Sequence, residues 1–299
     1  MSFIAPDNWL EIYDETISKT FKLIELEYID NIDKGILRSW LNNFKTKEEK
    51  YFATIILNSL VYRNENAILS IFENIIHMKL PKIMNSLGLN INSIQELELM
   101  LKTPKAISSL NFCISTVEGV DKNIGKSGEV LNRLLKSKEL IYKTINFNIP
   151  GAKNKPKKIN TIIFIDDIVG TGSQFIKFYK KYKNKIEWFD NIIYLPLVAY
   201  QEGIEKIKKF NDSIIIEAME LLDKKDTFFY NDNEKFDKLN TITDLEDFYN
   251  ELINKNNLNV NSTEYDLNTL YFFKISSPNN NLPLVYYSNE SWNKLFLRF

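Results

Sequence analysis

Residues 159–178 read INTIIFIDDIVGTGSQFIKF, and this stretch predicts the fold of the chain around it. It begins with a run of β-branched and aromatic residues, continues with two adjacent acids, and turns through Gly-Thr-Gly-Ser into an amphipathic segment. A strand without polar alternation is typical of a parallel sheet that helices cover on both faces. The stretch therefore predicts a buried parallel strand, a glycine-rich loop and a helix, in that order.

The alternation of strand and helix continues on both sides of this stretch, over residues 106–220. Further apolar runs predict strands at 107–116, 139–147, 191–200 and 213–221. Right-handed crossovers place the carboxyl ends of parallel strands along one edge, which is where ligands of such sheets bind. We therefore expect an α/β domain with a parallel, Rossmann-like sheet and a ligand site at that edge.

The two flanking regions have different patterns. Residues 1–105 carry apolar side chains at spacings of three and four, which predicts an all-helical N-terminal domain. Residues 221–299 are less regular, with one amphipathic segment followed by aromatic runs around a Pro-Asn-Asn-Asn turn. We interpret this last region as a C-terminal cap on the α/β core.

The composition excludes several classes of function. The 299 residues carry a formal net charge of -1, which argues against a protein that coats nucleic acid by bulk electrostatics. The single cysteine, Cys113, and the single histidine, His77, exclude an internal disulfide and a zinc site built on several cysteines or histidines. No segment approaches the length of an apolar membrane span and the N-terminus lacks a signal-peptide pattern, so we expect a cytoplasmic protein without a membrane partner.

The loop after the predicted strand has the composition of a phosphate-binding loop. Glycine permits positive φ and close approach of a ligand to the backbone, and a helix N-terminus presents N–H groups that lack helical partners. The residues expected to surround a phosphate are Val169, Gly170, Thr171, Gly172 and Ser173.

Two acids, Asp166 and Asp167, come just before this loop. Carboxylates repel a nearby phosphate unless they bind something beside it, such as the vicinal hydroxyls of a sugar or a Mg²⁺ ion held by the phosphates. Phosphate and hydroxyl sites side by side suit a ribose 5-phosphate. The plain alternative is a strand that ends in a turn, with a Ser or Thr capping the next helix. A Walker loop fits less well, because it requires a Gly-Lys-Ser/Thr sequence.

With these residues identified, the stretch resembles the signature of the type I phosphoribosyltransferases. That signature has four apolar residues, two acids, two aliphatic residues, a small residue, Thr-Gly and a hydroxyl-bearing end, and it matches residues 162–174. The resemblance implies that Asp166 and Asp167 are catalytic acids that contact the ribose hydroxyls of phosphoribosyl pyrophosphate, while residues 169–173 wrap its 5-phosphate. It also implies Mg²⁺ as a cofactor, bound with the ligand and only indirectly by the acids.

The resemblance extends to two further loops. A pyrophosphate-binding loop is expected before the helix at 127–137, and its candidate residues are Lys122, Lys126 and Ser127. A mobile loop is expected before the signature strand, and its candidate residues are Lys153 and Lys155. A solvated linker is an equally good interpretation of this second, basic segment.

The whole layout resembles a divergent branch of this family that is associated with bacterial conflict and retron anti-phage defence systems. The stretches that carry this resemblance lie at 40–44, 278–283 and 292–298. Membership of such a branch would explain why Gly170 and Gln174 depart from the enzyme signature, and it leaves open whether the protein turns over a substrate.

Three functions stay open at this point. The first is an effector in anti-phage defence that transfers a phosphoribosyl group or cleaves a nucleotide. The second is a catalytically inactive sensor that binds a phosphorylated ribose or nucleotide. The third is a structural partner of a reverse transcriptase and its DNA, or of another defence-system protein. A homo-oligomer is compatible with all three.

Overall fold

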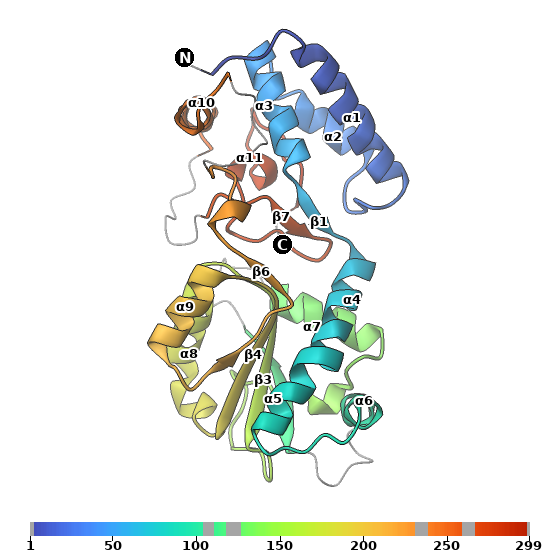
Figure 1. Cartoon of the computed structure of the whole chain (residues 1–299), viewed down its shortest axis with the longest axis vertical. Helices are drawn as coiled ribbons and strands as arrows, with labels where there is room; N and C mark the ends of the chain where they lie inside the picture. The colour runs from blue at the N-terminus through green and yellow to red at the C-terminus, as the bar shows by residue number, and fades with distance from the viewer. Residues whose placement is uncertain (1–2, 104–110, 118–126, 231–238, 259–266, 298–299) are drawn as a thin grey trace. The chain divides into compact units, whose positions relative to one another are not determined.

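The computed structural model describes residues 3–103, 111–117, 127–230, 239–258 and 267–297 (Figure 1). The chain divides into two compact units, Met1–Glu65 with Asp223–Arg298, and Asn66–Leu222. The first domain boundary expected from the sequence, at residue 105, therefore lies about 40 residues away from the observed one. The reason is that the helices after residue 65 are tied to the sheet, as in the ion pair of 3.0 Å between Lys79 and Glu217.

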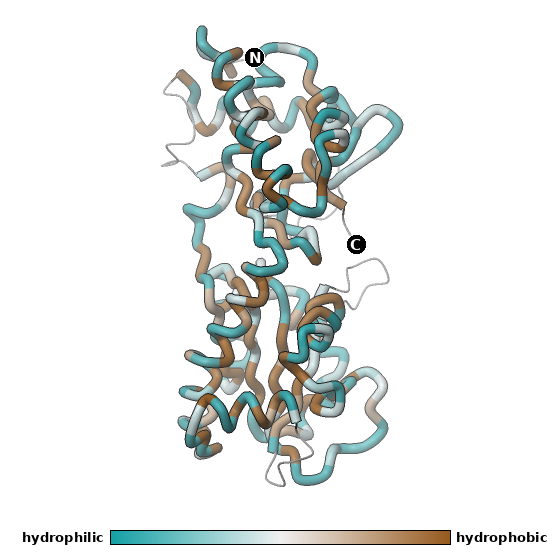
Figure 2. The backbone as a smooth tube through the Cα atoms, turned by 90° about the vertical axis from the view of Figure 1, so that its right-hand side faces the viewer, coloured by the Kyte–Doolittle hydropathy of each residue, from teal (hydrophilic) through white to brown (hydrophobic). Residues whose placement is uncertain are grey.

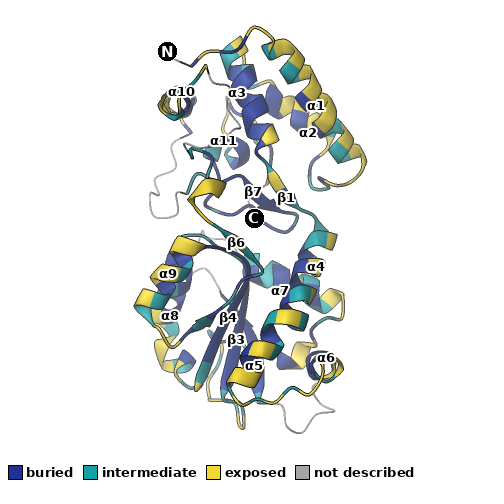
Figure 3. Ribbon diagram, in the orientation of Figure 1, coloured by how far each residue is buried: buried dark blue, intermediate teal, exposed yellow. Residues whose placement is uncertain are grey.

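A parallel sheet forms the centre of the second unit. Its strands are β2 (Phe112–Thr116), β3 (Thr161–Val169), β4 (Asn191–Tyr200) and β5 (Ile215–Ile216), in the order β2-β3-β4-β5, and β6 (Glu220–Leu222) also pairs with β4. All of these pairings are parallel. The central strands are almost wholly buried and apolar, as Figures 2 and 3 show.

Helices cover both faces of this sheet, which confirms the predicted α/β class (Figure 1). One face carries α8 (Ser173–Ile186) and α9 (Gln201–Phe210), and the other carries α4 (Glu65–Asn74), α5 (Leu80–Ser86) and α7 (Ser127–Ser137). The π-helical segment η1 (Ile75–Lys79) joins α4 to α5, and α6 (Ile94–Lys102) follows. The packing of α8 is aromatic, because Phe175 and Phe178 both contact the ring of Phe164 on β3 edge-on.

One expected strand, at 139–147, does not form. The segment contains a 3-10 helix, η3 (Lys143–Ile145), and only Asn146 makes a bridge, in parallel orientation, to Ile114 of β2. The three residues before Ile145 are exposed, so they lack the burial that a strand in this sheet has. Since β2 pairs with β3 along its other edge, the chain passes to the outside of β2 and then returns to β3. The connections thus reverse direction between β2 and β3, and ligands of open α/β sheets bind at the carboxyl ends of strands at such a point.

The first unit is mainly helical. It contains α1 (Trp9–Glu25), α2 (Lys34–Leu41), α3 (Lys47–Asn58), the 3-10 helix η4 (Lys224–Asp226), α10 (Ile242–Lys255) and α11 (Pro283–Tyr286). Its two short strands, β1 (Val61–Arg63) and β7 (Tyr271–Phe273), pair in parallel, so early and late parts of the sequence share one core. The run at 283–287, which follows the Pro-Asn-Asn-Asn turn, begins as the short helix α11.

The stretches near residues 40 and 280–293 pack against each other in this unit. The indole N–H groups of Trp40 and Trp292 both donate to the carbonyl oxygen of Leu284, at 2.8 and 3.1 Å. The ring of Phe44 contacts Trp292 edge-on, with a distance of 5.3 Å between ring centroids. These sequence stretches therefore have a structural role, which is to join the two ends of the chain.

Asn281 provides the main polar support of this core. Its side-chain oxygen accepts hydrogen bonds from the Thr269 hydroxyl (2.8 Å) and the Tyr271 N–H (2.7 Å), and its amide nitrogen donates to the carbonyls of Tyr271 (2.8 Å) and Pro278 (3.2 Å). The residue is 1% exposed, so water cannot replace these partners. Asn281 thus completes the backbone hydrogen bonds of β7.

We expect Asn281→Ala to lower the free energy of unfolding by roughly 3 kcal/mol, because several buried polar groups would lose their partners at about 1–3 kcal/mol each. The neighbour Asn280 is a matched control, since it is also buried but its side-chain nitrogen has no partner within the described residues. Asn280→Ala should cost less than about 1 kcal/mol. Equal losses of stability in urea denaturation of the two variants would contradict this account.

Candidate functional site

The candidate site lies at the carboxyl ends of β2 and β3, where α7 and α8 begin on opposite faces of the sheet (Figure 1). The strand β3 runs as far as Val169, so Asp166 and Asp167 lie inside it and not after its end. Both residues are 2% exposed. The acids that the sequence predicted as ligands of a sugar are therefore almost completely enclosed by the protein in this structure.

Asp166 is held by two hydrogen bonds. Its carboxylate accepts from the phenol of Tyr194 on β4, at 2.8 Å, and from the backbone N–H of Asp167, at 3.0 Å. The ring of Tyr194 stacks on Phe175 of α8, with centroids 4.2 Å apart. Burial raises the pKa of Asp166 well above its usual value, and the charge of Asp167 raises this pKa further. The structure thus disfavours the charged form of Asp166 relative to that of a solvent-exposed carboxylate.

Asp167 faces the start of α7. The hydroxyl of Ser127, the first residue of that helix, donates to its carboxylate at 3.0 Å. Gly128 is packed closely there, since a Cβ atom at this position would lie 3.1 Å from the carbonyl oxygen of Val117 and 3.4 Å from Oδ1 of Asp166. The structure therefore brings Ser127 and both acids together.

The predicted phosphate loop forms a tight turn into α8. Gly172 has φ of 74° and stands at the N-cap position of the helix. Only glycine adopts this left-handed conformation without strain, and it provides no side chain to occupy the N–H groups of the first turn. Gly170 and Thr171 are half-buried, while Gly172 and Ser173 are buried. The N–H groups at the start of α8 therefore lie behind a loop in which Gly170 and Thr171 are partly accessible to solvent.

The loop packs on the backbone of α9. A Cβ atom at Gly203 would lie 2.0 Å from the carbonyl oxygen of Gly170, and a Cβ atom at Gly172 would lie 2.7 Å from the carbonyl oxygen of Gly203. No residue with a side chain fits at position 203 without moving the loop. In the sequence, Gly203 is an isolated glycine inside a predicted helix, and such a glycine often indicates close packing against another part of the backbone.

A lysine from α9 also reaches the loop. Nζ of Lys206 donates to Oγ of Ser173 at 2.7 Å, and the hydroxyl of Thr171 donates to the same oxygen at 3.1 Å. The positive end of the α8 dipole and an ammonium group thus act at one point. Nothing in the sequence distinguished Lys206 from its neighbours, because lysine is abundant throughout the chain.

The structure does not bring the mobile-loop candidates Lys153 and Lys155 to this point. The segment that carries them follows Pro150. The carbonyl of Pro150 accepts a hydrogen bond of 2.7 Å from Lys185 in the last turn of α8. The segment is also fixed after its end by Asn160, which lies next to the first residue of β3. Both anchors lie at the edge of the sheet opposite to the site. The pyrophosphate-loop candidates Lys122 and Lys126 lie outside the described residues.

The single cysteine and histidine are placed away from the two acids. Cys113 is buried in β2, and burial raises the pKa of its thiol. Nε2 of His77 lies 2.8 Å from a carboxylate oxygen of Glu98, on helices far along the chain from β3. Within the described ranges no group of three or more His, Cys, Asp or Glu side chains could hold a metal ion. The same ranges contain no helix long and apolar enough to cross a membrane.

The raised pKa of Asp166 predicts a pH-dependent cost to stability. An acid whose pKa is higher in the folded protein than in the unfolded chain destabilises the fold as the pH rises above its unfolded value, near 3.8. Asp166→Asn removes this cost, so its melting temperature should exceed that of the wild type at neutral pH, and the difference should shrink as the pH falls towards 4. The exposed Asp190→Asn is the control. A difference that is constant with pH would contradict a buried, neutral Asp166.

The contact between α9 and the loop predicts that Gly203→Ala is not tolerated. The added methyl group overlaps the Gly170 carbonyl, and overpacking of this kind costs about 1–3 kcal/mol. Glu202→Ala, on the same turn and exposed, should change the free energy of unfolding by less than about 0.5 kcal/mol. Wild-type stability in Gly203→Ala, measured by chemical denaturation, would show that the loop does not depend on this contact.

Comparisons with known proteins show the family to which the chain belongs. A search of curated proteins gives no significant match. Among solved structures, the chain is similar to the orotate phosphoribosyltransferase from Aeropyrum pernix, at 14% sequence identity and a TM-score of 0.26, over 45% of this chain and 74% of that one. The family model PRTase-CE matches residues 37–298, which is most of the chain. The protein therefore belongs to the PRTase-CE family.

Proposed function

We propose that this protein binds a phosphorylated ribose, either phosphoribosyl pyrophosphate or a nucleotide, at the carboxyl ends of β2 and β3. The observation that carries the proposal is the contact of the α7 N-terminus with the acid pair, through Ser127 and Asp167, together with the phosphate-type loop and the α8 N-terminus that follow the pair in the chain. Helix N-termini attract anions, and carboxyl groups accept sugar hydroxyls. Membership of the PRTase-CE family supports the same class of ligand.

Each group has a distinct task in this proposal. The backbone N–H groups of residues 171–173 and the ammonium of Lys206 hold the 5-phosphate, because both present positive charge at the start of α8. Asp167 accepts a hydrogen bond from a ribose hydroxyl, in place of the one from Ser127. A neutral Asp166 adds no second negative charge next to the phosphate, so the repulsion expected from two carboxylates is reduced.

Mg²⁺ would accompany the ligand and not be part of the protein. The donor groups described at the site do not form a metal centre of their own, since one of the two acids is buried and favoured in its neutral form. When bound to the ligand's phosphates, the ion would neutralise their charge. The direct protein contacts to the ligand are the loop, Lys206 and Asp167.

For the biological role, we propose an effector in a bacterial anti-phage defence system of the retron type. The support for this role is the resemblance of three stretches at the ends of the chain, which pack together through Trp40, Leu284 and Trp292. A catalytically inactive sensor is the second candidate, and the burial of both acids favours it, because enclosed carboxyl groups suit a site that binds without turnover. A structural partner of a reverse transcriptase and its DNA is the third.

The proposed site predicts that phosphoribosyl pyrophosphate raises the melting temperature of the protein, and more so with Mg²⁺. A ligand at 100 times its dissociation constant stabilises the folded state by about 2.7 kcal/mol. Lys206→Met should reduce this shift, while Lys209→Met, an exposed lysine on the same helix, should leave it unchanged. Equal shifts in the two variants, or no shift with any phosphorylated ribose or nucleotide, would contradict the proposal.

The same measurement separates the three roles when it is combined with an assay for pyrophosphate release. If the double variant Asp166→Asn, Asp167→Asn loses both ligand binding and turnover, the protein is an effector enzyme. If binding is lost and the wild type shows no turnover, it is a sensor. If neither changes and assembly with the partner is intact, the structural role holds.

A further inference from the structure

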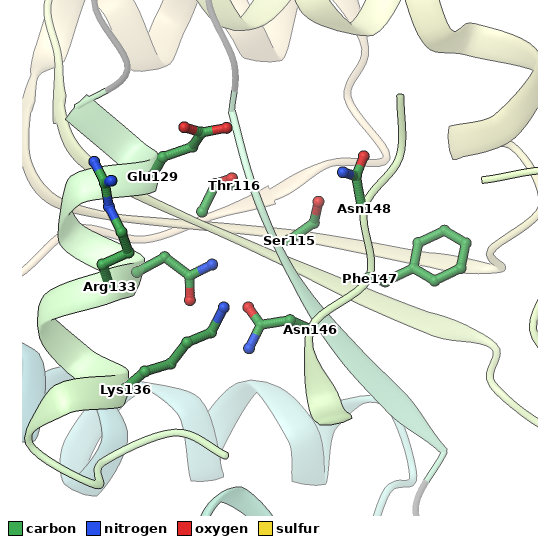
Figure 4. Close-up of a pocket in the computed structure, with 9 residues that line it drawn as sticks. Ser115, Thr116, Glu129, Arg133, Lys136, Asn146, Phe147 and Asn148 are labelled. Carbon is green, nitrogen blue, oxygen red and sulfur yellow. The ribbon is translucent and has the colours of Figure 1, made fainter. Parts of the chain in front are cut away.

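A polar cleft with a volume of about 260 Å³ lies between α7 and residues 146–148 (Figure 4). It is lined by Ser115 and Thr116 at the end of β2, by four polar residues of α7, and by the chain segment that runs outside β2. The cleft is separate from the phosphate loop, although both sites are bordered by α7. Neither the signature motif nor the order of elements predicted it.

Two acceptor groups in this cleft are left without partners. The side-chain oxygens of Asn132 on α7 and of Asn146 on the opposite wall are both buried, and neither accepts a hydrogen bond from any described residue. Buried amide oxygens are almost always paired, with protein or with an ordered molecule, because an unpaired one keeps its full desolvation cost. The two oxygens therefore mark positions at which a bound molecule, either ordered water or a ligand that displaces it, donates hydrogen bonds.

Two hydroxyl groups at the end of β2 are also buried and without hydrogen-bond partners among the described residues. Ser115 is 4% exposed and Thr116 is 8% exposed, and both line the cleft. Neither side chain makes a hydrogen bond within the described part of the chain. Because hydroxyls can both donate and accept, they add no preference for a charge, but they increase the number of polar contacts on offer.

The charged groups of the cleft favour an anion. Lys136 extends from α7 towards Asn146, as Figure 4 shows, and burial lowers the pKa of its ammonium group. Neither Lys136 nor the neighbouring Arg133 forms an ion pair with a described carboxylate. Glu129 is the one acid among the described residues that line the cleft, so these residues together carry a net positive charge. A partly desolvated cation without a counterion is stabilised by an oxyanion.

The size of the cleft limits the ligand. Pockets for drug-sized ligands are usually larger, at about 300–1,000 Å³. The cleft therefore suits a small metabolite and not a polymer.

We propose that this cleft is a second ligand site, for a small metabolite that carries an oxyanion together with N–H donors, as a nucleoside monophosphate does. The oxyanion binds Lys136, and the N–H groups donate to the side-chain oxygens of Asn132 and Asn146. An amino acid has the same combination of groups, with a carboxylate in place of the phosphate. The site does not depend on the loop at 169–173, and its ligand differs from the ribose phosphate proposed there in its requirement for N–H donors.

The test is isothermal titration calorimetry of the full chain with adenosine monophosphate and guanosine monophosphate. Ribose 5-phosphate serves as the oxyanion without N–H donors, adenosine as the N–H donor without an oxyanion, and glutamate as the carboxylate. We expect Lys136→Met and Asn146→Asp each to weaken binding of the preferred ligand at least ten-fold. These titrations are made in the Lys206→Met chain, in which binding at the proposed phosphate loop is weakened, and the added change Lys143→Met, at an exposed lysine outside the cleft, should leave the affinity unchanged.

Several results would overturn the proposal. One is that none of the monophosphates or glutamate binds, and another is that they bind Lys136→Met and Asn146→Asp as tightly as the wild type. If adenosine or ribose 5-phosphate bound as tightly as the monophosphates, the cleft would not recognise the combination of an oxyanion with N–H donors. Dependence on Lys206 alone would assign the binding to the phosphate loop, so this outcome is distinguishable from failure of the proposed function. If Asn146→Asp does not fold, Lys136→Met decides the result. Methionine removes the charge of the lysine but keeps an apolar side chain of similar length, so the packing of the cleft wall is retained.

Hydrogen exchange locates the binding independently. In the Lys206→Met chain, a ligand in the cleft should slow the exchange of backbone amides in α7 and at residues 146–148, with no change at residues 170–175. Protection confined to residues 170–175 would contradict a second site.

Discussion

The arrangement of the site depends on the burial of one carboxyl group, that of Asp166. A charged carboxylate is costly to remove from water, so the position is tolerated because Tyr194 and the backbone of Asp167 hydrogen bond to it and because its neutral form is favoured. The phenol of Tyr194 in turn is fixed by stacking on Phe175 in the first turn of α8. These contacts fix the positions of β3, β4 and α8 relative to one another.

Around this buried acid the protein brings polar backbone groups together by close packing of glycines. The loop at 170–172 lies against Gly203, and the first turn of α7 lies against Asp166 through Gly128. Each contact leaves no space for a side chain, so the N-termini of α7 and α8 approach the end of the sheet more closely than ordinary residues would allow. Such rigid, backbone-lined positions are the kind of surface that recognises a phosphate by geometry. The site is therefore defined by packing as much as by the acids that mark it in the sequence.

Much of the fold could be predicted from the sequence, because a run such as Thr161–Ile165 can only be buried on both faces of a parallel sheet. The segment 139–147 was wrong as a strand, since Ile141 and Ile145 are buried but the three residues between them are exposed, in a turn and a 3-10 helix that no local pattern distinguishes. The division into compact units at residue 65 is not visible in the sequence, because the helices on either side of it have the same periodicity and differ only in what they pack against. At the site, adjacency in the chain predicted the acids and the loop, whereas Tyr194 and Lys206 come from other elements and are recognisable only once the strands are paired.

The central claim is that the amides before α8 hold a phosphate while the acid pair holds the attached sugar. The most direct measurement is a crystal structure of the protein with ribose 5-phosphate. The account predicts the phosphate within hydrogen-bonding distance of the N–H groups of residues 171–173 and of Lys206, with a ribose hydroxyl on Asp167 and the Tyr194 contact to Asp166 preserved. A phosphate bound elsewhere, with the hydrogen bond between Lys206 and Ser173 unchanged, would contradict it.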